Sequence, residues 1–146
     1  MQLNQSTDYA IRMILYLAKV SHTIPSSKLA RAIGISPRYL LQIGAKLRDA
    51  GLVAVTYGVA GGYKISKHPA EISLLEIICL MEHKPCFPQP SSVQSKSFSH
   101  ALDAAYRHIS KMLADTLQGM TIQSLLSESN EWQGADFPFQ KSFTMP

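Results

Sequence analysis

The chain has 146 residues, of which 46% are hydrophobic, with a formal net charge of +4 and two cysteines. This length suits one domain with an appended helical element, and the composition excludes wholesale disorder and a disulfide-based scaffold. The sequence has no run of about 18 uncharged apolar residues to span a membrane and no basic stretch with a cleavage site for secretion, so we expect a cytoplasmic protein.

The charge is distributed unevenly along the chain. Residues 1–67 carry nine basic and two acidic groups, a net charge of +7, whereas residues 68–146 carry five basic and eight acidic groups, a net charge of −3. Basic charge gathered in one half is what neutralisation of nucleic-acid phosphates requires. Charge that only solubilises the surface is the alternative, but it does not explain why the sign changes near residue 67.

The basic half is predicted to begin with a helix over residues 7–20, where apolar side chains recur at helical spacing. Ser6 or Thr7 is expected to cap this helix. A shorter helix over residues 27–33 follows, which Ser26 or Ser27 is able to cap. Gly34 provides the left-handed residue that ends this helix. The long helix is expected to support the shorter helices from behind.

A further short helix and a hairpin complete this half. Ser36 is the predicted N-cap, Pro37 suits the first helical position, and the helix ends near residue 50. Residues 52–57 and 63–66 are predicted strands, joined by a glycine-rich tip. Two helices at a sharp angle followed by a β-hairpin form a winged helix-turn-helix, a reader of duplex DNA.

The acidic half is predicted to be helical. Ser73 and Glu76 match a capping box at the start of a helix over residues 74–81, which would bridge the two halves. A long helix is predicted over residues 98–118 and a short one over residues 121–126. The expected fold class is therefore mainly α with a small β-hairpin.

We divide the chain into a winged helix-turn-helix domain, a proline-interrupted loop, a dimerisation helix with a short following helix, and a tail. These segments cover residues 1–82, 83–97, 98–128 and 129–146. The aromatic side chains of the tail either dock on the body or remain loose, and the sequence leaves both alternatives open.

The long helix carries one apolar stripe. Its members are Phe98, Leu102, Ala105, Ile109, Met112 and Leu113. A helix joined to a compact domain by a loop must bury such a stripe, and the matching helix of a second copy would cover it, because operator readers are commonly two-fold dimers. Packing against the same chain is the alternative.

The second helix of the helix-turn-helix has two faces. Leu40, Ile43 and Leu47 share the face expected to pack on the N-terminal helix. Tyr39 is expected to pack as well, with its hydroxyl at a phosphate. The start of the preceding helix and the glycine-tipped hairpin are expected to grip the DNA backbone.

The residues expected to contact DNA lie on both short helices and on the hairpin. They are Ser26, Ser27, Lys28, Ser36, Pro37, Arg38, Tyr39, Leu41, Gln42, Lys46, Tyr57, Gly61, Gly62 and Lys64. Arg38 can bind guanine through two hydrogen bonds and Gln42 can do the same with adenine, whereas Leu41 can only touch a thymine methyl group. Plain alternatives are that Arg38 holds a phosphate and that Gln42 is solvated.

Five segments of the chain resemble the Rrf2 family of bacterial transcription regulators in order and spacing. They are Thr7-Asp8-Tyr9-Ala10, Ile35-Ser36-Pro37-Arg38-Tyr39-Leu40, Leu47-Arg48-Asp49-Ala50-Gly51-Leu52-Val53, Gly61-Gly62-Tyr63 and Ile72-Ser73-Leu74-Leu75-Glu76. The resemblance covers about residues 1–82 and is thin beyond. It implies a homodimer with a winged DNA-binding domain and a long dimerisation helix, which binds near-palindromic operators, usually as a repressor.

Two positions depart from the family pattern in ways that bear on the operator. Many members have an arginine at the base of the wing where this chain has Tyr57, and some have a glutamate on the recognition helix where it has Leu41. We therefore expect an operator that differs from those of such relatives. A small-molecule effector or a partner protein is expected to release the protein from it.

The cysteines also depart from the family. Members with an iron–sulfur cluster use three cysteines in the loop before the dimerisation helix, and here that loop contains only Cys86, with Cys79 in the preceding helix. A cluster normally takes four ligands, mostly thiolates. Asp8, His83 and His100 are candidate non-cysteine ligands, although Asp8 also suits a first-turn carboxylate. We expect no cluster and no other metal, and Cys86 is either a redox sensor or an ordinary exposed cysteine.

Catalysis is not expected. Cys86 with His83 or His100 would need an orienting group and an oxyanion or phosphate loop, which the sequence does not offer. The remaining histidines are too dispersed for a metal site. The alternative function is a winged-helix protein-interaction module without operator specificity, which DNA affinity lacking a steep salt dependence would favour.

Overall fold

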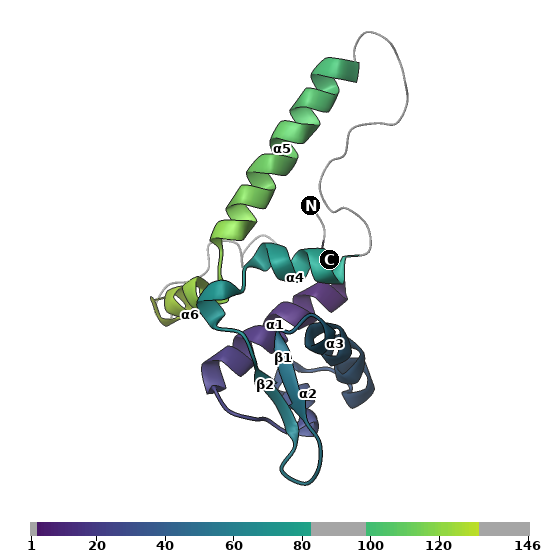
Figure 1. Ribbon diagram of the computed structural model, residues 1–146, viewed down its shortest axis with the longest axis vertical. Coiled ribbons are helices and arrows are strands. Elements are labelled where there is room, and N and C mark those ends of the chain that lie inside the picture. Colours follow the sequence, from purple (N-terminus) through teal and green to yellow (C-terminus); the bar gives the residue numbers. More distant parts are fainter. Residues whose placement is uncertain (1–2, 83–98, 132–146) are drawn as a thin grey trace, which may run out of the picture.

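A computed structural model describes residues 3–82 and 99–131 of the chain. It is mainly helical with one antiparallel hairpin (Figure 1). A 3-10 turn at Pro69–Glu71 follows the hairpin. The longer elements are α1 (Gln5–Val20), α2 (Ser26–Ile33), α3 (Pro37–Asp49), β1 (Val53–Thr56), β2 (Gly62–Ile65), α4 (Leu74–Met81), α5 (Ser99–Gly119) and α6 (Ile122–Glu131). The predicted helices and both strands are present, and the fold class is confirmed.

Helix α1 lies at the centre and contacts α2, α3, α4, α6 and β2. Its Met13 and Leu17 are fully buried, and Leu40, Ile43 and Leu47 of α3 belong to the same buried cluster, as their spacing predicted. Burial of each such side chain stabilises the fold by about 1.5–3 kcal/mol. The cluster therefore fixes the direction of α3, whose opposite face remains exposed.

The turn between α2 and α3 is set by local signals. Gly34 ends α2 in the left-handed region, with φ of +80°, as predicted. The Ser36 hydroxyl oxygen accepts a hydrogen bond from the backbone N–H of Tyr39 at 3.1 Å, and Pro37 occupies the first helical position. The chain therefore leaves one helix and starts the next within three residues.

The predicted caps of α1 and α2 are wrong. Asn4 and Pro25 are the N-cap residues, and neither side chain makes a capping bond in the described part of the chain. At α1 the reason is a distant carboxylate: Glu82 accepts hydrogen bonds from the Asn4 N–H at 2.9 Å, from Asn4 Nδ2 at 2.6 Å and from the Thr7 hydroxyl at 2.6 Å. Ser26 lies inside the first turn of α2, so it is past the position from which it could cap.

A single residue outside the hairpin, Ile24, forms a β-bridge with its second strand. β1 and β2 pair antiparallel, from Val53 opposite Ile65 to Thr56 opposite Gly62. Ile24, just before α2, exchanges both backbone hydrogen bonds with Tyr63, at 2.9 and 2.8 Å. The backbones approach so closely here that a Cβ on Gly62 would overlap the Ile24 carbonyl. The start of α2 is thereby fastened to the wing.

The turn between α5 and α6 is fastened to the start of α4. The Leu74 N–H donates to the Met120 carbonyl at 2.8 Å, and the Ile122 N–H donates to the Ile72 carbonyl at 2.9 Å. Ser73 caps α4 by accepting from the Glu76 N–H at 3.1 Å, as predicted. The Glu76 carboxylate instead binds Lys67 Nζ at 2.8 and 2.9 Å, which ties α4 to the end of the hairpin.

Helix α5 projects away from the rest of the fold, and the hairpin lies at the opposite end of the molecule (Figure 1). Leu117, near its C-terminal end, is buried, whereas Leu102, Ile109 and Met112 are 48%, 42% and 56% exposed. Packing within the same chain therefore leaves much of the stripe uncovered in the described residues. None of the helices in residues 3–82 and 99–131 is long and apolar enough to cross a membrane.

Candidate nucleic-acid interface

The outward face of α3 presents the side chains that the sequence singled out. Ser36, Pro37, Arg38 and Gln42 are exposed, and Leu41 is 54% exposed. All of them lie in the N-terminal half of the helix, the part with which recognition helices reach base edges. The face combines a cation, an amide and an aliphatic group.

Tyr39 lies at the edge of this face and packs inward. Its ring meets the ring of Tyr9 on α1 edge to face, with the centroids 5.8 Å apart and the planes at 88°. Aromatic pairs with this geometry contribute about 0.5–1.5 kcal/mol beyond area burial. The prediction that Tyr39 packs is confirmed.

The start of α2 presents backbone amides to solvent. Ser27 and Lys28 are exposed and Ser26 is half-buried. Because the first amides of a helix have no intrahelical acceptor, they are suited to bind an anion such as a phosphate group. The missing side-chain cap on Pro25 leaves this turn without a competing acceptor among the described residues.

The loop of the wing carries two exposed large apolar side chains. Tyr57 is 80% exposed and Val59 is fully exposed. Arg48, at the end of α3, donates to the Tyr57 hydroxyl at 3.4 Å and pairs with Asp49 Oδ1 through Nη2 at 2.9 Å and Nε at 3.0 Å. The hydrogen bond and charge of Asp49 raise the pKa of Arg48, so this guanidinium stays charged. Its position links the last turn of α3 to the wing.

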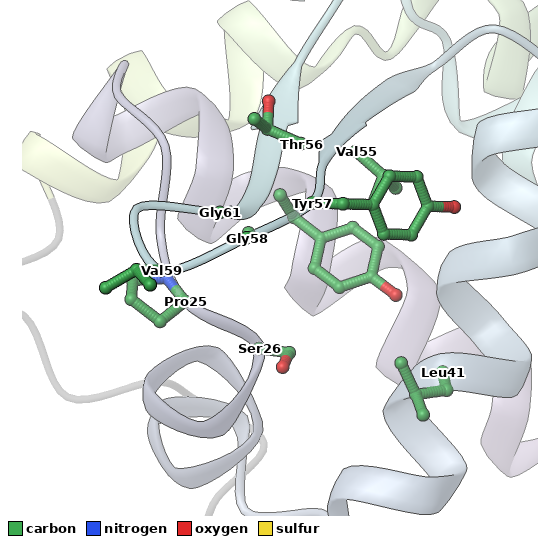
Figure 2. Close-up of a pocket in the computed structure, with 11 residues that line it drawn as sticks. Pro25, Ser26, Leu41, Val55, Thr56, Tyr57, Gly58, Val59 and Gly61 are labelled. Carbon is green, nitrogen blue, oxygen red and sulfur yellow. The ribbon is translucent and has the colours of Figure 1, made fainter.

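A hollow of about 300 Å³ separates the wing from α2 and α3. Wing residues 56–59 and Gly61 border one side of it, and Ser26 and Leu41 border the other (Figure 2). Of the predicted contact residues, the hollow brings together Ser26, Leu41, Tyr57, Gly61 and Gly62.

The three predicted lysines lie outside this hollow, and Lys28 is exposed at the start of α2. Lys64 is exposed on β2 and stands opposite exposed Ala54, so it belongs to the hairpin face that points away from buried Tyr63. Lys46 is half-buried and lines a smaller hollow of about 80 Å³ with Tyr39, Gln42 and Met81. The predicted contact residues therefore do not form one cluster. They are spread over the large hollow, the small hollow, the outer face of the hairpin and the exposed starts of α2 and α3.

The sequence reasoning did not identify how the wing is held against α3. A Cβ built on buried Gly44 would lie 2.6 Å from Cε1 and from the hydroxyl oxygen of Tyr63, so the phenol ring occupies the space that a side chain would need. Burial raises the pKa of Tyr63. The signal was present in the sequence, because a glycine inside a helix costs about 0.5–1 kcal/mol relative to alanine and so indicates a close approach.

Residues 3–128 match the family described as Rrf2, "Iron-dependent Transcriptional regulator". The chain belongs to the Rrf2 family. Among Rrf2-type relatives, the chain is 27% identical over 143 residues to "HTH-type transcriptional regulator IscR" of Aliivibrio salmonicida, covering 93% of this chain and 83% of that one. It is 31% identical over 131 residues to "Protein aau3" of Rhizobium meliloti (strain 1021), covering 86% and 85%. The structure of T. potens IscR superposes with a TM-score of 0.75 at 24% identity, covering 94% of each chain.

These similarities establish a winged-helix regulator. The Rrf2 family is one of DNA-binding transcriptional regulators and not of enzymes. The likeness to the T. potens structure shows that the overall fold is shared.

The family description names iron, and the donors of this chain do not fit a thiolate-bound cluster. The chain has two cysteines; Cys79 is exposed on α4 and Cys86 lies outside the described residues. Within residues 3–82 and 99–131, no three His, Cys, Asp or Glu side chains gather as a metal site. Asp8 pairs with Arg12 at 2.6 Å in the first turn of α1. Since a cluster takes four ligands, mostly thiolates, we derive no role for iron.

Proposed function

We propose that this Rrf2-family chain is a homodimeric repressor that binds a near-palindromic operator and is released by a signal yet to be identified. Helix α3 enters the major groove, and the wing lies against the neighbouring backbone. The observation that carries the proposal is the exposed face of α3 beside the glycine-tipped wing, in the half of the chain that carries a net charge of +7. A basic surface with a protruding helix suits duplex DNA.

Base reading is assigned to the first two turns of α3. Arg38 and Gln42 have the donors that pair with guanine and adenine edges, and each good two-bonded contact discriminates by about 1–3 kcal/mol. The first amides of α2, with Lys28, hold a phosphate. This division matches the usual one, in which phosphate contacts position the protein and base contacts specify the sequence.

Dimerisation is assigned to α5. Leu102, Ile109 and Met112 are exposed on a helix that leaves the body, and a two-fold partner covers the same stripe on both copies. Phe98 of the predicted stripe lies outside the described residues. In this proposal residues 1–82 form the DNA-binding domain. Residues 98–128 form the dimerisation segment, which sets the distance between the two DNA-binding domains. Residues 83–97 are the loop between these segments, and residues 129–146 are the tail.

Release from the operator requires an effector that binds the two states with different affinity. Cys86 as a redox sensor, a small-molecule effector and a partner protein are the three proposed triggers. Because the protein acts on operators in bacterial DNA, we place it in the cytoplasm.

Selection of genomic DNA fragments by the purified full chain near physiological salt, followed by footprinting, tests this function. We expect a two-fold symmetric site with half-sites about 34–36 Å apart, one helical turn. The logarithm of the affinity should also fall linearly with that of the salt concentration. Enrichment of no sequence, together with weak salt dependence, would instead favour a protein-interaction module.

A further inference from the structure

The exposed large apolar side chains of the described residues fall into two groups. Leu102, Ile109 and Met112 lie on α5, where a second copy is proposed to cover them, and Met120 directly follows that helix. The other three, at positions 41, 57 and 59, all lie in the DNA-reading half and all line the hollow between α3 and the wing. A scattered exposed apolar residue needs no explanation, but three around one hollow do.

Leu41 is the member of this group on the recognition helix. It lies in the second turn of α3, between Arg38 and Gln42, and faces the wing across the hollow (Figure 2). Its side chain has no donor or acceptor, so it can read a base edge only through apolar contact. The apolar feature of the major groove is the C5-methyl group of thymine.

We propose that Leu41 makes this chain select thymine at one position in each half-site, through contact with the 5-methyl group. The inference rests on the proposed function, since it needs α3 in the major groove. Tyr57 and Val59 contribute by bordering the same hollow and excluding water from that contact, and Arg48 positions Tyr57 through the bond to its hydroxyl. Arg38 and Gln42 read neighbouring bases by hydrogen bonding, so Leu41 adds a base that they do not specify.

The test uses the operator obtained by genomic selection, with each thymine replaced in turn by deoxyuridine, which removes only the methyl group. We expect one thymine in each half-site at which the substitution weakens binding about fourfold, corresponding to about 0.8 kcal/mol for one buried methyl group. A 5-methylcytosine at that position should be bound more tightly than an unmodified cytosine.

Leu41→Ala is expected to abolish this discrimination, binding the thymine and uracil operators equally. Gln42→Ala on the same face is the matched control, which should keep the fourfold preference while weakening binding overall. Both positions are exposed, and a thermal melt checks that each variant is folded.

Two results would overturn the inference. One is wild-type protein that binds every uracil-substituted operator as tightly as the original, and the other is a preference for thymine that survives in Leu41→Ala. Either result leaves sequence-specific binding intact, so the proposed function stands. Failure to recover any operator would overturn the proposed function and this inference together.

Discussion

The phenol ring of Tyr63 lies directly against the backbone of Gly44, where a Cβ would come within 2.6 Å of the hydroxyl oxygen. Gly44 is in the middle of α3. Tyr63 lies on β2 between two neighbours: it stands opposite Val55 of β1 and exchanges backbone hydrogen bonds with Ile24 on its other side. This contact limits how closely the recognition helix and the wing can approach.

Gly44→Ala is expected to destabilise the fold. Alanine would favour the helix by about 1 kcal/mol, but forcing a methyl group into the ring costs about 1–3 kcal/mol. The clash should win, lowering the free energy of unfolding in urea by up to about 2 kcal/mol, which is the difference between these two contributions. In the double variant with Tyr63→Leu the added cost of the alanine should largely disappear, and an equal cost in both backgrounds would contradict this account.

The burial of Tyr63 predicts a loss of stability in alkali. Burial raises the pKa of Tyr63 above its ordinary value of 10.0, so the folded state favours the neutral phenol. This contribution is fully present below pH 10.0 and is lost as the pH rises through the folded-state pKa. Urea titrations across this range should show a smaller fall in the free energy of unfolding for Tyr63→Phe than for wild type.

The contacts of Glu82 with the start of α1 predict a stabilising role for its carboxylate. Glu82→Gln keeps the shape but replaces one acceptor oxygen by a donor and removes a negative charge from the helix N-terminus. The free energy of unfolding should fall by about 1–3 kcal/mol. Glu71→Gln, at an exposed carboxylate, should stay within about 0.5 kcal/mol of wild type. If both variants lowered the free energy of unfolding equally, Glu82 would have no special role at the start of α1.

Arg38→Ala separates base reading from phosphate binding. If Arg38 reads a guanine, the variant should lose about 1–3 kcal/mol on the operator and accept other bases at one position. Competition binding with operator and random DNA measures both. An equal loss on random DNA, with a shallower salt slope, would make Arg38 a phosphate anchor. Arg31→Ala, which removes the same charge from the end of α2, should leave base preference unchanged.

A charge in the apolar stripe of α5 should disrupt the dimer. Ile109→Asp would bury a carboxylate in the proposed interface, so the variant should sediment as a monomer of 16.1 kDa while wild type sediments at twice that mass. Ala104→Asp adds the same charge at an exposed position off the stripe and should remain dimeric. Monomeric wild-type protein at micromolar concentration would contradict the assignment.

The parts of the fold that were predicted correctly depend on neighbouring residues. Gly34, Ser36 and Pro37 act within a single turn, and the apolar spacing on α3 separates its buried and exposed faces without reference to the rest of the chain. For the same reason, the outward residues of α3 could be named in advance.

The missed features join residues far apart in sequence. The acceptor at the start of α1 is Glu82, 78 residues from Asn4, and the partner of Ile24 is in β2. No periodic pattern encodes such pairs. Helix α6 also runs further than predicted, to Glu131. At its start Thr121 and Ser124 cap each other reciprocally, at 3.0 and 3.1 Å. That signal was local and was overlooked.

Helix α5 is a long helix that is attached to the body of the fold at its C-terminal end. Its 21 residues span about 31 Å, and the backbone bonds of Leu74 and Ile122 hold only the end beside α4. A tilt of about 10° at that base displaces the far end by about 5 Å, roughly the rise of one helical turn. Small repacking beneath Ile72 and Ser73 is therefore magnified along the helix. In the proposed dimer, the spacing between the two DNA-reading domains would respond to changes made far from the DNA.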